Sequence, residues 1–125
     1  MARILVVEPN DDVRALIADV LTSGGHDVHC VINGAEALAR LDGFTFDLIL
    51  SDLTMPGIEG IRLYWEIASR WPHLTSRLVY VAGAVDAGSS DYHILLADEV
   101  PLVMKPFQPE FLLDVVARAL ARGTP

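Results

Sequence analysis

The sequence has little positive charge and almost no cysteine. Nine Lys and Arg residues stand against 17 Asp and Glu residues, which gives a formal net charge of -8 at pH 7. Because proteins that bind nucleic-acid phosphates need clustered Lys and Arg, this balance predicts no direct nucleic-acid partner. Cys30 is the single cysteine, so an internal disulfide and a cysteine-rich metal site are both excluded.

Long apolar runs are missing as well, although 52% of the residues are hydrophobic. No stretch approaches the roughly 20 apolar residues that span a bilayer, and the first residues lead directly into a strand pattern instead of a signal peptide. We therefore expect no membrane insertion and a cytoplasmic location. A length of 125 residues predicts a single domain over residues 1–125, with a core over about residues 3–121.

Short apolar runs alternate with segments of helical period. Strands are predicted over residues 3–7, 27–32, 47–51, 77–82 and 102–104, and helices over 13–21, 34–42, 58–70, 92–97 and from 109 onward. In the helix over 58–70, the inward face is expected to carry Ile61, Tyr64, Trp65 and Ala68. This alternation predicts an α/β fold, a parallel sheet with helices on both faces.

Acidic side chains and one lysine follow the predicted strands. In a doubly wound sheet, functional groups gather outside the carboxyl ends of the strands, so Glu8, Asp52, Ala82 and Lys105 should meet there. Two carboxylates about 5 Å apart repel each other by roughly 3 kcal/mol. A hard divalent cation such as Mg²⁺ and the Lys105 amine would offset that repulsion. The same charges would stabilise a phosphoryl group on Asp52.

Part of this acidic pattern also has a structural interpretation. Asp11 and Asp12 are better explained as N-caps of the first helix, and Asn10 also suits a cap. Capping explains Asp52 less well, because an apolar strand runs directly into this acid. Lys105 precedes Pro106, and a cis bond between them would aim the amine inward.

Three stretches, "ILVVEPNDDVR", "DLILSDLTMPGIEG" and "VMKPF", resemble the signature stretches of the receiver domain of two-component response regulators. The resemblance implies a flavodoxin-like, three-layer sandwich whose five-stranded parallel sheet has the order 2-1-3-4-5. It also implies that Asp52 accepts a phosphoryl group from a sensor histidine kinase or a histidine phosphotransfer protein. Lys105 would contact the phosphate, while Mg²⁺ would bind Glu8, Asp52 and the backbone carbonyl of Thr54. The stretch over residues 77–107 is similar to C-terminal receivers of hybrid histidine kinases, which points to a phosphorelay.

Pro9 departs from the family pattern at the second of two acidic positions after the first strand. That position is normally a direct magnesium ligand, so the resemblance implies weakened Mg²⁺ binding here. Two side chains are candidates to compensate: Glu8, which is one methylene longer than aspartate, and Asp11 at the start of the helix.

Two further departures affect the switch positions of the family. Ala82 stands where a hydroxyl residue is expected, which leaves the backbone N–H groups of Gly83 and Ala84 for a phosphoryl oxygen. Leu102 replaces the aromatic switch residue. These changes keep an alternative open, in which a degenerate receiver binds partners without being phosphorylated.

An enzymatic function is the least favoured alternative. Phosphatases similar to haloacid dehalogenases carry a second Asp two residues after the nucleophile, and this sequence has Thr54 there, which leaves no general acid for turnover. We therefore expect that the chain is not an enzyme. Monomer and homodimer both stay open. A homodimer would use the fourth helix, the fifth strand and the last helix, with Leu102, Phe107 and Phe111 on the shared face.

Overall fold

A computed structural model describes residues 2–53, 60–83, 86 and 88–122 of the chain. Its strands form one parallel sheet in the order β2-β1-β3-β4-β5. The strands are β1 (Arg3–Val7), β2 (Asp27–Val31), β3 (Leu48–Asp52), β4 (Leu78–Ala82) and β5 (Leu102–Met104). The predicted fold class and strand order are confirmed. Asp52, which was expected to follow β3, is its last residue.

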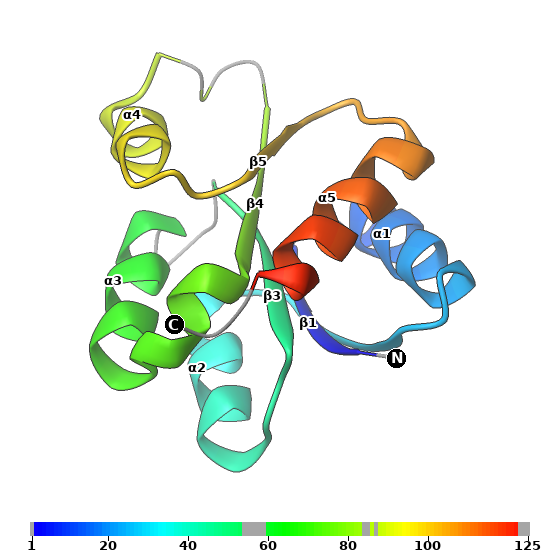
Figure 1. Ribbon diagram of the computed structural model, residues 1–125, viewed down its shortest axis with the longest axis horizontal. Coiled ribbons are helices and arrows are strands. Elements are labelled where there is room, and N and C mark those ends of the chain that lie inside the picture. The colour runs from blue at the N-terminus through cyan, green and yellow to red at the C-terminus, as the bar shows by residue number, and fades with distance from the viewer. Residues whose placement is uncertain (1, 54–59, 84–85, 87, 123–125) are drawn as a thin grey trace.

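Helices cover both faces of this sheet (Figure 1). They are α1 (Asp11–Ser23), α2 (Gly34–Gly43), α3 (Gly60–Arg70), α4 (Ser90–Ala97) and α5 (Pro109–Ala121), with a 3-10 helix, η1 (Pro72–Arg77), that was not predicted. In Figure 1, α1 and α5 lie on one side of the strands, and α2, α3 and α4 lie on the other. None of the helices in the described ranges is long and apolar enough to cross a membrane.

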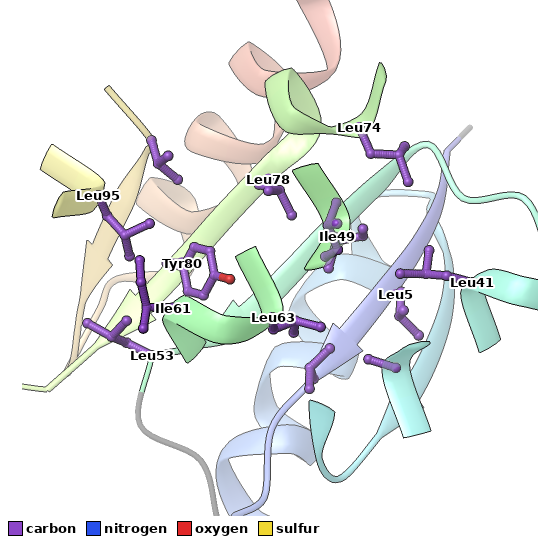
Figure 2. Packing of buried hydrophobic residues seen from close by; sticks show 14 of the residues in the cluster. Leu5, Leu41, Ile49, Leu53, Ile61, Leu63, Leu74, Leu78, Tyr80 and Leu95 are labelled. Atoms are coloured by element: carbon purple, nitrogen blue, oxygen red, sulfur yellow. The ribbon is translucent and has the colours of Figure 1, made fainter. Parts of the chain in front are cut away.

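Alternating strand residues supply two separate apolar cores, because successive side chains point to opposite faces of a sheet. Leu5 and Ile49 pack with Leu63 and Ile67 of α3 in the first core, which Figure 2 shows from close by. Ile4 and its neighbours on the other face pack against α1 and α5. Both faces of the strands are therefore buried, which explains why the strands read as almost continuous apolar runs.

The prediction of which residues form the inward face of α3 was partly wrong. Ile61 is buried, but Trp65 is 53% exposed, and Leu63 and Ile67 are buried in its place. Leu63 and Ile67 are four residues apart and so lie on one stripe of the helix. The sheet docks against that stripe, and Trp65 projects away from it.

The start of α1 also differs from the expected cap. Asn10, not Asp11 or Asp12, is the N-cap, and its side-chain oxygen accepts a hydrogen bond from the N–H of Val13 at 3.0 Å. The two aspartates occupy the first turn of α1, where a negative charge interacts favourably with the helix dipole. One polar residue is thus sufficient to cap the helix, and it stands between Pro9 and the acids.

Candidate functional site

The carboxyl ends of four strands lie side by side at one edge of the sheet. Val7 of β1 is in register with Ser51 of β3, and Asp52 is in register with Val81 of β4. The backbone N–H of Lys105 donates to the carbonyl of Ala82 at 2.8 Å, which fixes the end of β5 against the end of β4. Residues that are far apart in the sequence are therefore neighbours at this edge.

The amine of Lys105 bridges two carboxylates. Its Nζ lies 3.2 Å from Oε1 of Glu8 and 3.2 Å from Oδ1 of Asp52. The Glu8 and Asp52 side chains are only 1% and 8% exposed, whereas Lys105 is 27% exposed. The Lys105–Pro106 peptide bond is cis, as expected from the sequence. The structure thus brings together three of the predicted site residues.

Burial sets the protonation of Asp52. Loss of solvent, together with the negative charges of Glu8 and Asp86, raises the pKa of Asp52 to about 6, against the opposing effect of Lys105. Burial by itself would lower the pKa of Lys105, but Asp52 and Glu8 outweigh that effect and the pKa is raised. At neutral pH the site therefore holds an ionised, poorly solvated carboxylate beside a charged amine.

Glu8 is held rigidly at the end of β1. Its Oε2 accepts a hydrogen bond from the backbone N–H of Asn10 at 3.0 Å. Its Oε1 is buried and, apart from the ion pair with Lys105, has no hydrogen-bond partner among the described residues. Arg14 of α1 donates to the backbone carbonyl of Glu8 at 3.0 Å, a contact that was not foreseen from the sequence.

The oxygen atoms at this edge of the sheet are of the kind that bind a hard cation. Carboxylate oxygens are the ligands that Mg²⁺ prefers, and the Glu8 Oε1 atom and Asp52 supply them. Over the ranges that the structure describes, there is no group of three or more His, Cys, Asp or Glu side chains that could hold a metal ion. Thr54, whose carbonyl was predicted as a ligand, lies outside those ranges.

Asp11 lies apart from this cluster. Its side chain is 88% exposed and is paired with Arg14. Glu8, in contrast, is buried within reach of Lys105. Of the two side chains predicted to compensate for Pro9, the structure therefore places only Glu8 beside Asp52 and Lys105.

The two residues that were expected at switch positions, Ala82 and Leu102, have small or aliphatic side chains. Ala82 is fully buried at the end of β4, and Leu102 is half-buried on β5, where it pairs with Tyr80. The Gly83 N–H, which was expected to serve a phosphoryl oxygen, donates to Oδ2 of Asp86 at 2.7 Å in this structure. Ala84 lies outside the described residues.

The ends of the connection after β3 are tied closely together. The N–H of Gly60 donates to the carbonyl of Leu53 at 3.1 Å, and the buried hydroxyl of Tyr80 donates to the carbonyl of Gly60 at 2.7 Å. A Cβ atom at residue 60 would lie only 2.3 Å from the Leu53 oxygen. Glycine is therefore required at this point, where α3 begins beneath the site.

Asp86 is the site residue that the sequence analysis missed. It is a buried carboxylate, and its charge acts on Asp52. The available signal was weak: an acid four residues beyond Ala82, in a stretch rich in Gly and Ser that suits a turn. Nothing in that pattern predicts that the side chain is buried.

Comparison with known proteins identifies the family. The model of the response regulator receiver domain matches residues 4–117 of the chain. The chain belongs to this family. It is 36% identical to the response regulator protein FleR of Pseudomonas aeruginosa over 94% of the chain and 24% of FleR. It is also 32% identical to the transcriptional regulatory protein TcrA of Mycobacterium tuberculosis, over 98% of the chain and 47% of TcrA.

A solved structure shows the same receiver fold. The crystal structure of the receiver domain of NtrX from Brucella abortus superposes with a TM-score of 0.87 at 27% identity, covering 96% of this chain and 99% of that one. The chain spans about a quarter of FleR and about half of TcrA. Receiver domains are signalling domains that generally bind Mg²⁺ at their phosphorylation site and interact with histidine kinases or phosphotransfer proteins.

Proposed function

We propose that residues 1–125 form a single receiver domain that accepts a phosphoryl group on Asp52 in a two-component or phosphorelay pathway. The observation that carries this proposal is the buried Asp52 carboxylate held 3.2 Å from the Lys105 amine at the carboxyl end of the sheet. The donor would be a phosphohistidine of a sensor histidine kinase or of a histidine phosphotransfer protein. The cytoplasm is the expected location, because response regulators of this kind act there.

The geometry supports an in-line transfer of the phosphoryl group. An oxygen of Asp52 attacks phosphorus as the bond from phosphorus to the histidine nitrogen breaks, and the released imidazole takes up a proton from water. Lys105 already lies beside that oxygen, so its positive charge stabilises the negative charge of the transferred group. A pKa of about 6 leaves Asp52 ionised, and hence nucleophilic, at neutral pH.

Mg²⁺ would be held by Glu8, Asp52 and the carbonyl of Thr54. When bound, such a cation neutralises charge on the phosphoryl oxygens. Pro9 provides no side-chain oxygen at the second acidic position, so we expect weaker Mg²⁺ binding than in a receiver with an acid there. Pro9→Asp should therefore bind Mg²⁺ more tightly in a calorimetric titration, and equal affinity of the variant and the natural chain would refute this role of Pro9.

Phosphorylation by a small-molecule donor tests the proposal. Incubation with acetyl phosphate and Mg²⁺ should increase the intact mass by one phosphoryl group, and Asp52→Asn should abolish the increase. Asp27→Asn, at an exposed acid on the opposite edge of the sheet, is the matched control and should leave it unchanged. An unchanged mass in the natural chain would favour the degenerate receiver instead.

We expect that the chain has no enzymatic turnover, since Thr54 replaces the second acid that a related phosphatase chemistry would use.

A homodimer through α4, β5 and α5 stays a prediction. On that face Phe111 is half exposed, while Leu102 and Phe107 are partly buried. Sedimentation with and without acetyl phosphate would measure whether two copies of the chain associate.

A further inference from the structure

Asp86 is a third buried acid near the carboxyl ends of the strands, after Glu8 and Asp52. Its side chain is 9% exposed, and its Oδ2 accepts the Gly83 N–H at 2.7 Å. Gly83 directly follows Ala82, the last residue of β4. The charge of Asp86 also contributes to the raised pKa of Asp52, which places the two carboxylates within electrostatic reach of each other.

Asp86 joins the end of β4 to the start of α4 through a continuous run of hydrogen bonds. Its N–H donates to the Gly83 carbonyl at 3.0 Å, and its own carbonyl accepts from the N–H and the hydroxyl of Ser89 at 2.9 and 2.7 Å. The Ser89 oxygen in turn caps α4 by accepting the Tyr92 N–H at 3.1 Å. A movement of Asp86 would therefore displace Ser89 and alter the first turn of α4.

The hydrogen bond from Gly83 to Asp86 matters because residue 82, beside it, is an alanine. An alanine has no hydroxyl that could donate to a phosphoryl oxygen on Asp52, so the adjacent backbone N–H of Gly83 is the next donor along the strand. In the unphosphorylated protein that N–H already has a charged acceptor. An acyl phosphate carries about one more negative charge than the carboxylate from which it forms, and it would repel the neighbouring Asp86.

We propose that Asp86 is a positioning residue that holds the Gly83 N–H in the unphosphorylated protein and releases it to a phosphoryl oxygen after Asp52 is phosphorylated. This inference rests on the proposed function of Asp52. Departure of the Asp86 carboxylate from Gly83 pulls on Ser89 and loosens the N-cap of α4. Asp86 thereby takes over, through the backbone, the coupling that a hydroxyl at residue 82 would otherwise provide.

The hydrogen bond from Gly83 to Asp86 can be followed directly in the full chain. We expect a through-hydrogen-bond NMR coupling between the Gly83 amide nitrogen and the Asp86 carboxyl carbon in the resting protein. Beryllofluoride with Mg²⁺, a mimic of the phosphoryl group, should abolish this coupling. If fluorine NMR shows bound beryllofluoride while the coupling persists, the inference is overturned and the proposed function stands. If no beryllofluoride binds, the proposed function fails and the inference fails with it.

Substitutions separate the charge of Asp86 from its hydrogen bond. Asp86→Asn keeps an acceptor oxygen for the Gly83 N–H and removes the charge, so beryllofluoride should bind severalfold more tightly than to the natural chain. Asp91→Asn removes a nearby acid in the first turn of α4 and should leave the affinity unchanged. A purely structural role for Asp86 would move neither affinity, and equal values for the two variants would overturn the inference.

Removal of the whole Asp86 side chain tests the link to α4. Asp86→Ala should speed hydrogen exchange at the Tyr92 amide, which is bonded to Ser89, whereas Asp91→Asn should not. Unchanged exchange at Tyr92 in a folded Asp86→Ala protein would contradict the link. The coupling measurement on the natural chain does not depend on how well this variant folds.

Discussion

The two ends of the parallel sheet carry the same kinds of side chain in different surroundings. At the amino end, Arg3 and Asp27 form an ion pair at 3.5 Å, and both side chains are about half exposed. At the carboxyl end, Lys105 pairs at 3.2 Å with Glu8 and Asp52, which are almost fully buried. Water screens the first pair and is largely excluded from the second.

This difference indicates that burial, more than residue type, sets how strongly the charges interact at each end of the sheet. One amine faces two buried carboxylates at the carboxyl end, so the charges there do not balance without a further cation or a proton. The pKa of Asp52 is raised to about 6 because it is buried and because the negative charges beside it exceed the positive one.

Removal of the amine should have the largest effect. Lys105→Met keeps an apolar stem of similar length but leaves Glu8 and Asp52 without their cation, so the free energy of unfolding at pH 8 should fall by about 2–4 kcal/mol. Arg3→Met breaks only an exposed pair at the opposite end and should cost about 0.5 kcal/mol. Urea denaturation followed by circular dichroism measures both changes. Equal losses for the two variants would contradict the comparison.

Removal of a buried acid should stabilise the protein. The pKa of Asp52 rises from 3.8 in the unfolded chain to about 6 in the folded one, so the folded state holds the proton more tightly. Asp52→Asn should therefore unfold with a free energy higher by up to about 3 kcal/mol above pH 6. The gain should shrink as the pH falls from 6 to 4 and vanish below that, where both states are protonated.

The matched control for this effect is Asp27→Asn at the amino end. It removes an acid that is 61% exposed and should change the unfolding free energy by about 0.5 kcal/mol or less. Denaturation series at several pH values distinguish the two variants. An Asp52→Asn protein less stable than the natural chain at pH 8 would show that the lysine pair outweighs the burial of Asp52.

A neutral buried hydrogen bond near the carboxyl end should have a smaller effect. Tyr80→Phe removes the buried hydroxyl that donates to the Gly60 carbonyl, at a cost of about 1 kcal/mol. Tyr64→Phe removes an exposed bond to Asp98 and should cost less. Thermal unfolding of the pair measures the contrast. A larger loss for Tyr64→Phe would mean that burial does not decide the strength of these bonds.

Most of the fold was predictable because the strands are buried on both faces. Their apolar runs stand out from the helices in the sequence, and the bounds of β1 and β5 agree with the predicted ones. The meeting of Glu8, Asp52 and Lys105 followed from the rule that parallel strands present their carboxyl ends at one edge. Both successes depend on regular backbone geometry that a sequence pattern records.

The remaining features depend on contacts that no local pattern records. The sequence of α3 contains two neighbouring apolar stripes, one with Trp65 and one with Leu63 and Ile67, and only docking on the sheet selects between them. The burial of Asp86 depends in the same way on where its connection folds. The N-cap at Asn10 was one of three adjacent polar candidates, separated only by backbone conformation.

The most direct test of the account is an NMR titration of the Asp52 carboxyl carbon, assigned by comparison with Asp52→Asn. We predict a midpoint at about pH 6, because the carboxylate is buried and faces Glu8 and Asp86 with Lys105 as its neutralising partner. A midpoint near 3.8, the ordinary value for an aspartate, would contradict the claim that burial makes this acid the reactive one.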